Sequence, residues 1–190
     1  MIDTTFWREV HEKQAAYDNS RREIIAEANR ALHLAKQAIF ALHREDVDDA
    51  LKKIDNSSDI LVQLEKKHQG DDKLRSEGSW SAAIEEFVEA SLFKSYLAKS
   101  KVGEVTGPRV RPHEYIGGFA DYTGELVRYA ILQASKGNYQ EVKNIAGEVN
   151  DAIAILLEYN LTGVLRTKFD QAKKNLRKME EIVYELSLRS

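Results

Sequence analysis

Two pairs of acidic residues have the spacing that places carboxylates side by side on a helix. Glu86 and Glu89 are three residues apart, and Asp121 and Glu125 are four apart. Helical residues at such spacings are neighbours, with Cβ atoms about 5 to 6 Å apart. Carboxylate oxygens suit hard divalent ions such as Mg²⁺ or Mn²⁺. If two helices bring both pairs together, the four carboxylates predict a divalent-metal site.

Other catalytic or metal-binding patterns are weaker. The five histidines lack the HExxH spacing of zinc hydrolases, and the single Glu65-x-x-His68 motif is only part of what a di-iron bundle needs. Cysteine is absent, which excludes disulfides and thiolate metal sites. There is no nucleophile elbow and no glycine-rich phosphate loop. The acidic pairs remain the best candidates, although such pairs more often form solvated or salt-bridged faces, here with Arg128 or Lys94 as partners.

Basic residues are the candidates for contacts to a phosphate backbone. The net charge is −3 at pH 7, so a basic surface that coats duplex nucleic acid is not expected. Binding would depend on local Arg and Lys side chains, which position a backbone through charge. Two of them, Arg109 and Arg111, lie in a flexible loop over residues 99–112, which also contains both prolines. The candidates are Arg128, Lys94, Arg109, Arg111 and Arg22.

Long amphipathic helices are expected to position these residues. The 190 residues fit one domain, 1–190, and 43% hydrophobic and 31% charged residues with only two prolines are typical of helices with solvated outer faces. Apolar residues recur at spacings of three and four, without the alternation of strands. The predicted helices span residues 4–43, 47–67, 79–99, 113–135, 139–159 and 164–188.

Two of these helices carry the acidic pairs. Apolar residues surround nearly the whole of helix 79–99, which predicts that it is central and buried. Helix 113–135 contains Gly117, Gly118 and Gly124, and each costs about 1 kcal/mol relative to Ala in a helix interior. Close approach of another backbone or a ligand would explain them. We therefore expect helix 79–99 to lie near Asp121.

The predicted fold class is all-α, an elongated bundle of about six to seven helices. The first helix would be roughly 60 Å long at 1.5 Å per residue, too long for so small a domain to cover, so a partner subunit is expected. The start MIDTTFWREV lacks the features of a signal peptide, and no apolar run approaches the ~18 to 20 residues that cross a bilayer. A cytoplasmic protein without membrane contact is expected.

Four segments, in the same order and covering most of the chain, resemble the translin/Trax family. The segment with TGEL and the closing YELSLR are the most specific of them. The resemblance implies a helical, translin-like fold that assembles into a hollow oligomer, typically an octamer, in which single-stranded RNA is cut with Mg²⁺. The four segments are SRREIIAEANRALHLAKQAIFALHR (20–44), EEFVEA (85–90), YIGGFADYTGELVR (115–128) and KMEEIVYELSLR (178–189).

The resemblance also assigns roles to the acidic residues. Trax, the catalytic subunit of the family, uses two glutamates three apart on one helix and an aspartate just before the TGEL segment, whereas translin lacks this set. The matching residues here are Glu86, Glu89 and Asp121, which would hold one or two Mg²⁺ or Mn²⁺ ions. Glu125 would complete the shell or act as general base. The implied function is a Mg²⁺-dependent endoribonuclease that assembles with itself, as a homo-octamer.

Two other functions fit the same residues. A translin-like protein would bind single-stranded RNA or DNA without cutting it, and EDTA-sensitive cleavage of an oligonucleotide separates it from a nuclease. A purely structural helical oligomer would keep its acidic pairs in salt bridges. It predicts no Mg²⁺ binding and no affinity for nucleic acid at low salt.

Overall fold

The structure is a computed structural model that describes residues 1–188. All regular secondary structure within these residues is helical, which confirms the predicted fold class. Most predicted helices match to within two residues, but the short α3 was not predicted. The helices are α1 (Thr4–His43), α2 (Val47–Lys67), α3 (Asp72–Arg75), α4 (Gly78–Leu97), α5 (Pro112–Ser135), α6 (Tyr139–Leu157) and α7 (Gly163–Ser187).

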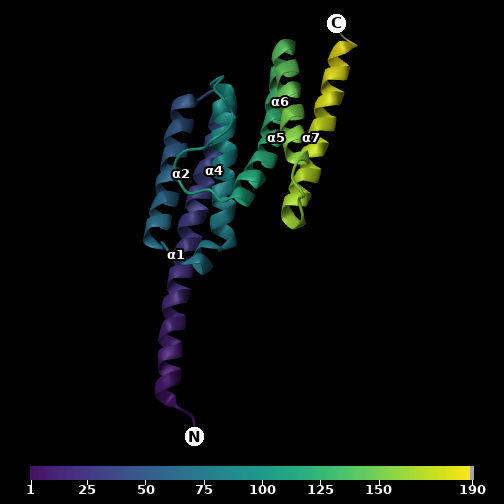
Figure 1. Ribbon diagram of the computed structural model, residues 1–190. Coiled ribbons are helices and arrows are strands. Elements are labelled where there is room, and N and C mark those ends of the chain that lie inside the picture. The colour runs from purple at the N-terminus through teal and green to yellow at the C-terminus, as the bar shows by residue number, and fades with distance from the viewer. Residues whose placement is uncertain (189–190) are drawn as a thin grey trace.

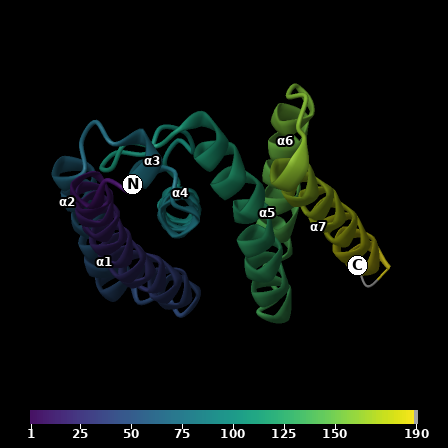
Figure 2. The same cartoon turned by 90° about the horizontal axis from the view of Figure 1, so that it is seen from below.

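The helices form two groups that meet at α4 and α5. The helices α1, α2 and α4 pack against one another, and α5, α6 and α7 form the second group (Figures 1 and 2). The helix α4 is central, as predicted, because it contacts α1, α2 and α5 and buries Trp80, Phe87 and Phe93 almost completely. No helix within the described residues is long and apolar enough to cross a membrane.

The two halves of α1 have different surroundings. Ala28, Ala31, Ala35 and Ala38 are fully buried, and such small side chains allow neighbouring helices to approach closely. Residues 1–16, in contrast, are all exposed and extend beyond the rest of the bundle (Figure 1). This half carries large apolar side chains, so the expectation of a partner subunit stays open.

The helix ends follow from local chemistry. Asp46 caps α2 by accepting a hydrogen bond from the backbone N–H of Asp49. At the start of α5, Pro112 takes a position where its missing N–H is not needed, and the Glu114 carboxylate accepts a hydrogen bond from the Arg111 backbone at 2.8 Å. Gly137 follows α5 with a φ of +77°, so the predicted end of this helix is confirmed.

The glycines of α5 allow close contact with α4, as the sequence predicted. A Cβ atom on Gly118 would lie 2.5 Å from the backbone oxygen of Glu85 and 2.8 Å from Cβ of Val88. A Cβ atom on Gly117 would lie 2.8 Å from Cδ of Glu85. Gly124 is less crowded, with Asn175 at 3.5 Å as the one neighbour within 4 Å. Gly117 and Gly118 therefore set the separation between the two helices that carry the acidic pairs.

We expect Gly118→Ala to destabilise the fold by roughly 1 to 3 kcal/mol, because rigid backbone of α4 occupies the space of the new methyl group. The matched control is Gly147→Ala in α6, where nothing lies within 4 Å of the added Cβ. That change should stabilise the protein by up to about 1 kcal/mol through helix propensity. Urea unfolding of both variants measures the difference. Equal effects in the two variants would contradict the proposed close contact.

Candidate metal and catalytic site

The helices α4 and α5 bring the predicted carboxylates into one acidic cluster. Burial is the main reason that the pKa values of Glu86 and Glu89 are raised, and the negative charges of Asp121 and Glu125 raise both further, so the two pairs share one electrostatic environment. A third glutamate of α4 joins them through a shared lysine. The acidic cluster consists of Glu85, Glu86, Glu89, Asp121 and Glu125.

Glu89 is the most unusual member of the cluster. It is only 8% exposed, and its carboxyl group has no hydrogen bond or ion pair within residues 1–188. Burial first, and then the negative charge of Glu86, raise its pKa from 4.5 to about 9. In the absence of a bound cation, Glu89 therefore carries a proton at neutral pH.

Glu86 is less strongly affected because it has a basic neighbour. Its carboxylate lies 3.7 Å from Nζ of Lys36 on α1. Burial raises the pKa of Glu86 to about 6, and the positive charge of Lys36 opposes part of this rise. The helix α1 thus contributes a charge to the site that the spacing of acidic residues did not reveal.

Lys168 of α7 is a second basic residue that the sequence did not reveal. Its Nζ atom lies 2.7 Å from Oε2 of Glu85 and also binds Oδ2 of Asp121. Burial alone lowers the pKa of Lys168, but the hydrogen bonds to Asp121 and Glu85 outweigh this effect and raise it. Lys168 follows Asp121 by 47 residues on another helix, so no local spacing signal marks it.

Glu125 is held on one side by a buried histidine. Its Oε2 atom lies 2.5 Å from Nε2 of His43, the last residue of α1, and 3.5 Å from Nη1 of Arg128. The His43 ring packs against Phe93 with a centroid separation of 4.7 Å. These contacts hold the Oε2 atom of Glu125, whereas its Oε1 atom has no hydrogen bond within the described residues.

Two of the three predicted metal ligands, Glu86 and Asp121, lie beside positively charged side chains of the protein. Within residues 1–188, no group of three or more His, Asp or Glu side chains is arranged to hold a metal ion directly. Lys168 binds Asp121, and Nζ of Lys36 lies 3.7 Å from Glu86. The donor set nevertheless fits Mg²⁺ or Mn²⁺ in its chemistry, since it offers hard oxygens and a buried Glu89 that has no ion pair within residues 1–188. The metal assignment stays a prediction.

Of the basic residues predicted to contact phosphate, Arg128 is the one that reaches the acidic cluster. Its side chain is 45% exposed and lies over the Phe40 ring, with Cζ 4.6 Å from the ring centroid. Lys94 instead lines a polar pocket between α2, α4 and the loop that follows α4, together with Asp55 and Glu104. Lys94 and the glutamates of the acidic cluster therefore lie on the same helix, α4, but in different surroundings, and Lys94 does not line the cluster.

The other predicted phosphate contacts lie outside the cluster. Arg109 is 75% exposed, with its guanidinium 3.9 Å from Glu65. Arg111 is the residue that precedes α5, and its side chain bonds to Ser76. Arg22 bonds to Asn19 on its own helix. Arg109 and Arg22 are exposed and Arg111 is half-buried, and the structure does not bring any of the three to the carboxylates.

Glu114 lies on α5 seven residues before Asp121, which places both on one face of the helix, but Glu114 belongs to a separate ion pair. It is fully buried and binds the Arg75 guanidinium through two hydrogen bonds of 2.7 and 2.8 Å. Arg75 also bonds to Glu65, so the Glu65-x-x-His68 motif takes part in a structural network. On this face of α5, Glu114 therefore forms a buried structural ion pair, whereas Asp121 and Glu125 belong to the acidic cluster.

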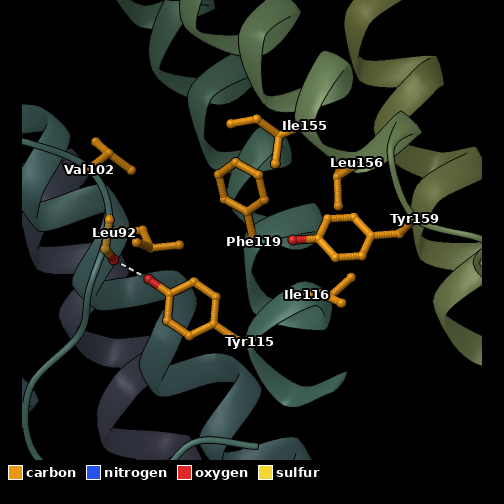
Figure 3. Close-up of a pocket in the computed structure, with 9 residues that line it drawn as sticks. Leu92, Val102, Tyr115, Ile116, Phe119, Ile155, Leu156 and Tyr159 are labelled. Carbon is orange, nitrogen blue, oxygen red and sulfur yellow. Dashed lines mark hydrogen bonds between the residues drawn. The ribbon is translucent and has the colours of Figure 1, made fainter. Parts of the chain in front are cut away.

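An apolar pocket of about 190 Å³ lies beside the loop after α4 (Figure 3). The Tyr115 hydroxyl donates a hydrogen bond to the backbone oxygen of Gly103 and so anchors this loop to α5. No member of the acidic cluster lines the pocket, so it is not part of the candidate site. The lining residues are Leu92, Val102, Gly103, Tyr115, Ile116, Phe119, Ile155, Leu156 and Tyr159.

Comparisons with known proteins agree on one family. The model of the Translin family matches residues 20–190. Translin of Gallus gallus is 27% identical over 144 residues, which cover 68% of this chain and 63% of that protein. Translin-associated protein X of Pongo abelii is 23% identical, and the match covers 94% of this chain and 74% of that protein. The chain therefore spans less than two thirds of the length of the translins it matches.

Two solved structures share the fold. The crystal structure of apo-NeC3PO has a TM-score of 0.84 and 21% identity, with 97% of each chain covered. The complex of AfC3PO with duplex RNA has a TM-score of 0.83 and 19% identity, with 96% of this chain and 97% of that chain covered. At these identities, the likeness establishes the arrangement of helices.

Proposed function

Because this chain belongs to the translin family, we propose that it is a Mg²⁺-dependent endoribonuclease that cleaves single-stranded RNA. The observation that supports this proposal most directly is Glu89, a buried carboxyl group beside Glu86 and Asp121 that has no hydrogen bond or ion pair within residues 1–188. Such a group is costly in its charged form unless a cation compensates it. A divalent ion would supply that compensation.

In this proposal Glu86, Glu89 and Asp121 provide the oxygen ligands for one or two Mg²⁺ ions, with Mn²⁺ as a substitute. A bound ion would lower the pKa of a water molecule and stabilise the leaving oxygen of the phosphodiester. Glu125 is held through Oε2 by His43, so its Oε1 atom is the candidate to accept a proton from the attacking water. Arg128, at the rim of the cluster, would hold a phosphate oxygen.

The proposal includes assembly into a homo-octameric shell that encloses the site. The exposed half of α1 supports it, because Phe6 and Trp7 are 54% and 58% exposed and would be covered by another copy. An enclosed site favours flexible single strands, since a stiff duplex enters a shell less easily. AfC3PO has been solved with duplex RNA, so both forms of RNA belong in the test.

The test is cleavage of a labelled RNA oligonucleotide by the purified protein, as a single strand and as a duplex, with Mg²⁺ or with EDTA. We expect Mg²⁺-dependent cleavage of the single strand, faster than that of the duplex, and no cleavage in EDTA. Native mass measurement of the same sample reports the number of subunits. Cleavage that persists in EDTA would refute the metal-dependent mechanism, and faster cleavage of the duplex would refute the stated preference.

The alternative is a non-catalytic protein that binds single-stranded RNA or DNA. The chain is similar to translins as well as to translin-associated protein X, and the similarity to translins supports this second function. It predicts oligonucleotide binding that is equally strong in EDTA and in Mg²⁺, with intact oligonucleotide after long incubation. Binding without cleavage would therefore favour this function over the nuclease.

A further inference from the structure

Lys168 reaches from α7 into the acidic cluster formed by α4 and α5. Its side chain is 21% exposed, and its ammonium group bridges Glu85 and Asp121. Lys168 makes no hydrogen bond to Glu86 or Glu89 within the described residues. Asp121, one of the predicted metal ligands, is thus already bound to the Lys168 ammonium group.

The position of Glu85 depends on the glycine that faces it. The Glu85 carboxyl group occupies the space next to Gly117, where any Cβ atom would lie 2.8 Å from Cδ. This placement brings Oε2 of Glu85 within 2.7 Å of Lys168 Nζ. The ammonium group therefore has two carboxylate partners, Glu85 and Asp121. The Glu85 carboxylate fits beside α5 because Gly117 has no side chain.

We propose that Lys168 is a built-in counter-ion of the acidic cluster, which a divalent ion must displace from Asp121 when it binds. The inference rests on the proposed metal site. An ammonium group and a divalent ion repel each other at contact distances, so both cannot bind the same Asp121 oxygen closely. Glu85 holds the displaced lysine beside the cluster, since it remains a hydrogen-bond acceptor after Asp121 has turned to the metal.

Lys168 is therefore a positioning residue that sets the affinity for the divalent ion. Without it, the Asp121 carboxylate has no ion-pair partner within the described residues, and the positive charge that repels the divalent ion is gone. Lys168→Met retains much of the aliphatic length of the side chain and removes the charge. We expect this variant to bind Mn²⁺ about tenfold more tightly than the wild type, or better. Loss of a merely structural contact would not tighten metal binding.

The experiment measures Mn²⁺ binding to the full chain without RNA, by electron paramagnetic resonance of the free ion. Lys168→Arg, which keeps the charge, should bind no more tightly than the wild type. Lys173→Met is the matched control, because Lys173 lies on the same helix and pairs with Asp170, outside the cluster. It should leave Mn²⁺ affinity unchanged. If Lys168→Met does not fold, as judged by circular dichroism, Lys168→Gln replaces it.

The outcomes separate this inference from the proposed function. Mn²⁺ binding that is lost in Glu89→Gln but not tightened in Lys168→Met overturns the role of Lys168 and leaves the metal site standing. Mn²⁺ binding that is insensitive to Glu89→Gln overturns the proposed metal site. Tight binding that appears only in Lys168→Met supports the inference. Absence of binding in every variant overturns both.

Discussion

Glu89→Gln should reduce RNA cleavage by roughly 100-fold or more and leave the helical bundle intact. A catalytic metal supplies several kcal/mol of transition-state stabilisation, and each 1.4 kcal/mol corresponds to a factor of ten in rate. Glutamine keeps the shape of the side chain but replaces a charged metal ligand by a neutral amide. Single-turnover cleavage at saturating protein measures the loss, and RNA binding in EDTA should be nearly unchanged.

The same variant should change how stability depends on pH in the metal-free protein. The pKa of Glu89 is raised from 4.5 to about 9 in the folded state. A raised pKa contributes stability below the unfolded value, and this contribution is lost as the pH rises through the folded value. Metal-free wild type should therefore lose stability between about pH 4.5 and 9, and Glu89→Gln should remove part of that loss. Thermal unfolding in EDTA across this range reports it.

Glu180→Gln on α7 is the matched control, because Glu180 is exposed and has no ion pair within the described residues. It should retain both cleavage and the wild-type pH dependence. Full cleavage by Glu89→Gln would remove Glu89 from the metal site. A steeper loss of stability in Glu89→Gln than in the wild type would contradict its assignment as a buried, protonated carboxyl group.

Glu114→Gln should destabilise the protein by about 3 to 5 kcal/mol, because it leaves the buried Arg75 without its main counter-charge. The Arg75 side chain is 5% exposed, and that of Glu114 is fully buried. Glu114 also accepts hydrogen bonds from the Ser81 hydroxyl and the Arg111 backbone. One carboxylate therefore connects α3, α4 and the start of α5. Urea unfolding at pH 7 measures the loss.

The ion pair also predicts sensitivity to acid. Burial alone would raise the pKa of Glu114, but the hydrogen bonds from Arg75 and Arg111 outweigh it and lower the pKa below its usual value of 4.5. A lowered pKa contributes stability above the unfolded value, and this contribution is lost as the pH falls through the folded value. Wild type should thus lose stability below about pH 4.5, and Glu114→Gln should lose less.

A double variant separates the charge effect from packing. Arg75→Met with Glu114→Leu removes both charges, and such replacements are often neutral or stabilising. We expect it to be more stable than either single variant. A double variant that loses the sum of the two single effects would show that the partners act independently.

Glu27→Gln is the control at a surface ion pair. Glu27 forms a partly exposed ion pair with Arg30, so this change should destabilise the protein by less than about 1 kcal/mol.

The sequence by itself determined the helices and the acidic pairs. The periods of three and four placed α1 and α2 at their observed bounds, because amphipathic spacing and capping residues are local properties of the chain. The glycines of α5 also predicted the close approach of α4, since Gly117 and Gly118 are unfavourable in a helix without such a neighbour. Glu86, Glu89, Asp121 and Glu125 could thus be assigned to one cluster in advance.

Only the tertiary structure decided which charges surround that cluster. Lys168, Lys36 and His43 come from helices far away in the chain, and no sequence spacing relates them to the carboxylates they contact. The structure also separated Glu114 from Asp121, although both lie on one stripe of α5, because each turn of that helix meets different neighbours. Local patterns specify a helix and its faces, whereas the partner of each face depends on packing between distant segments.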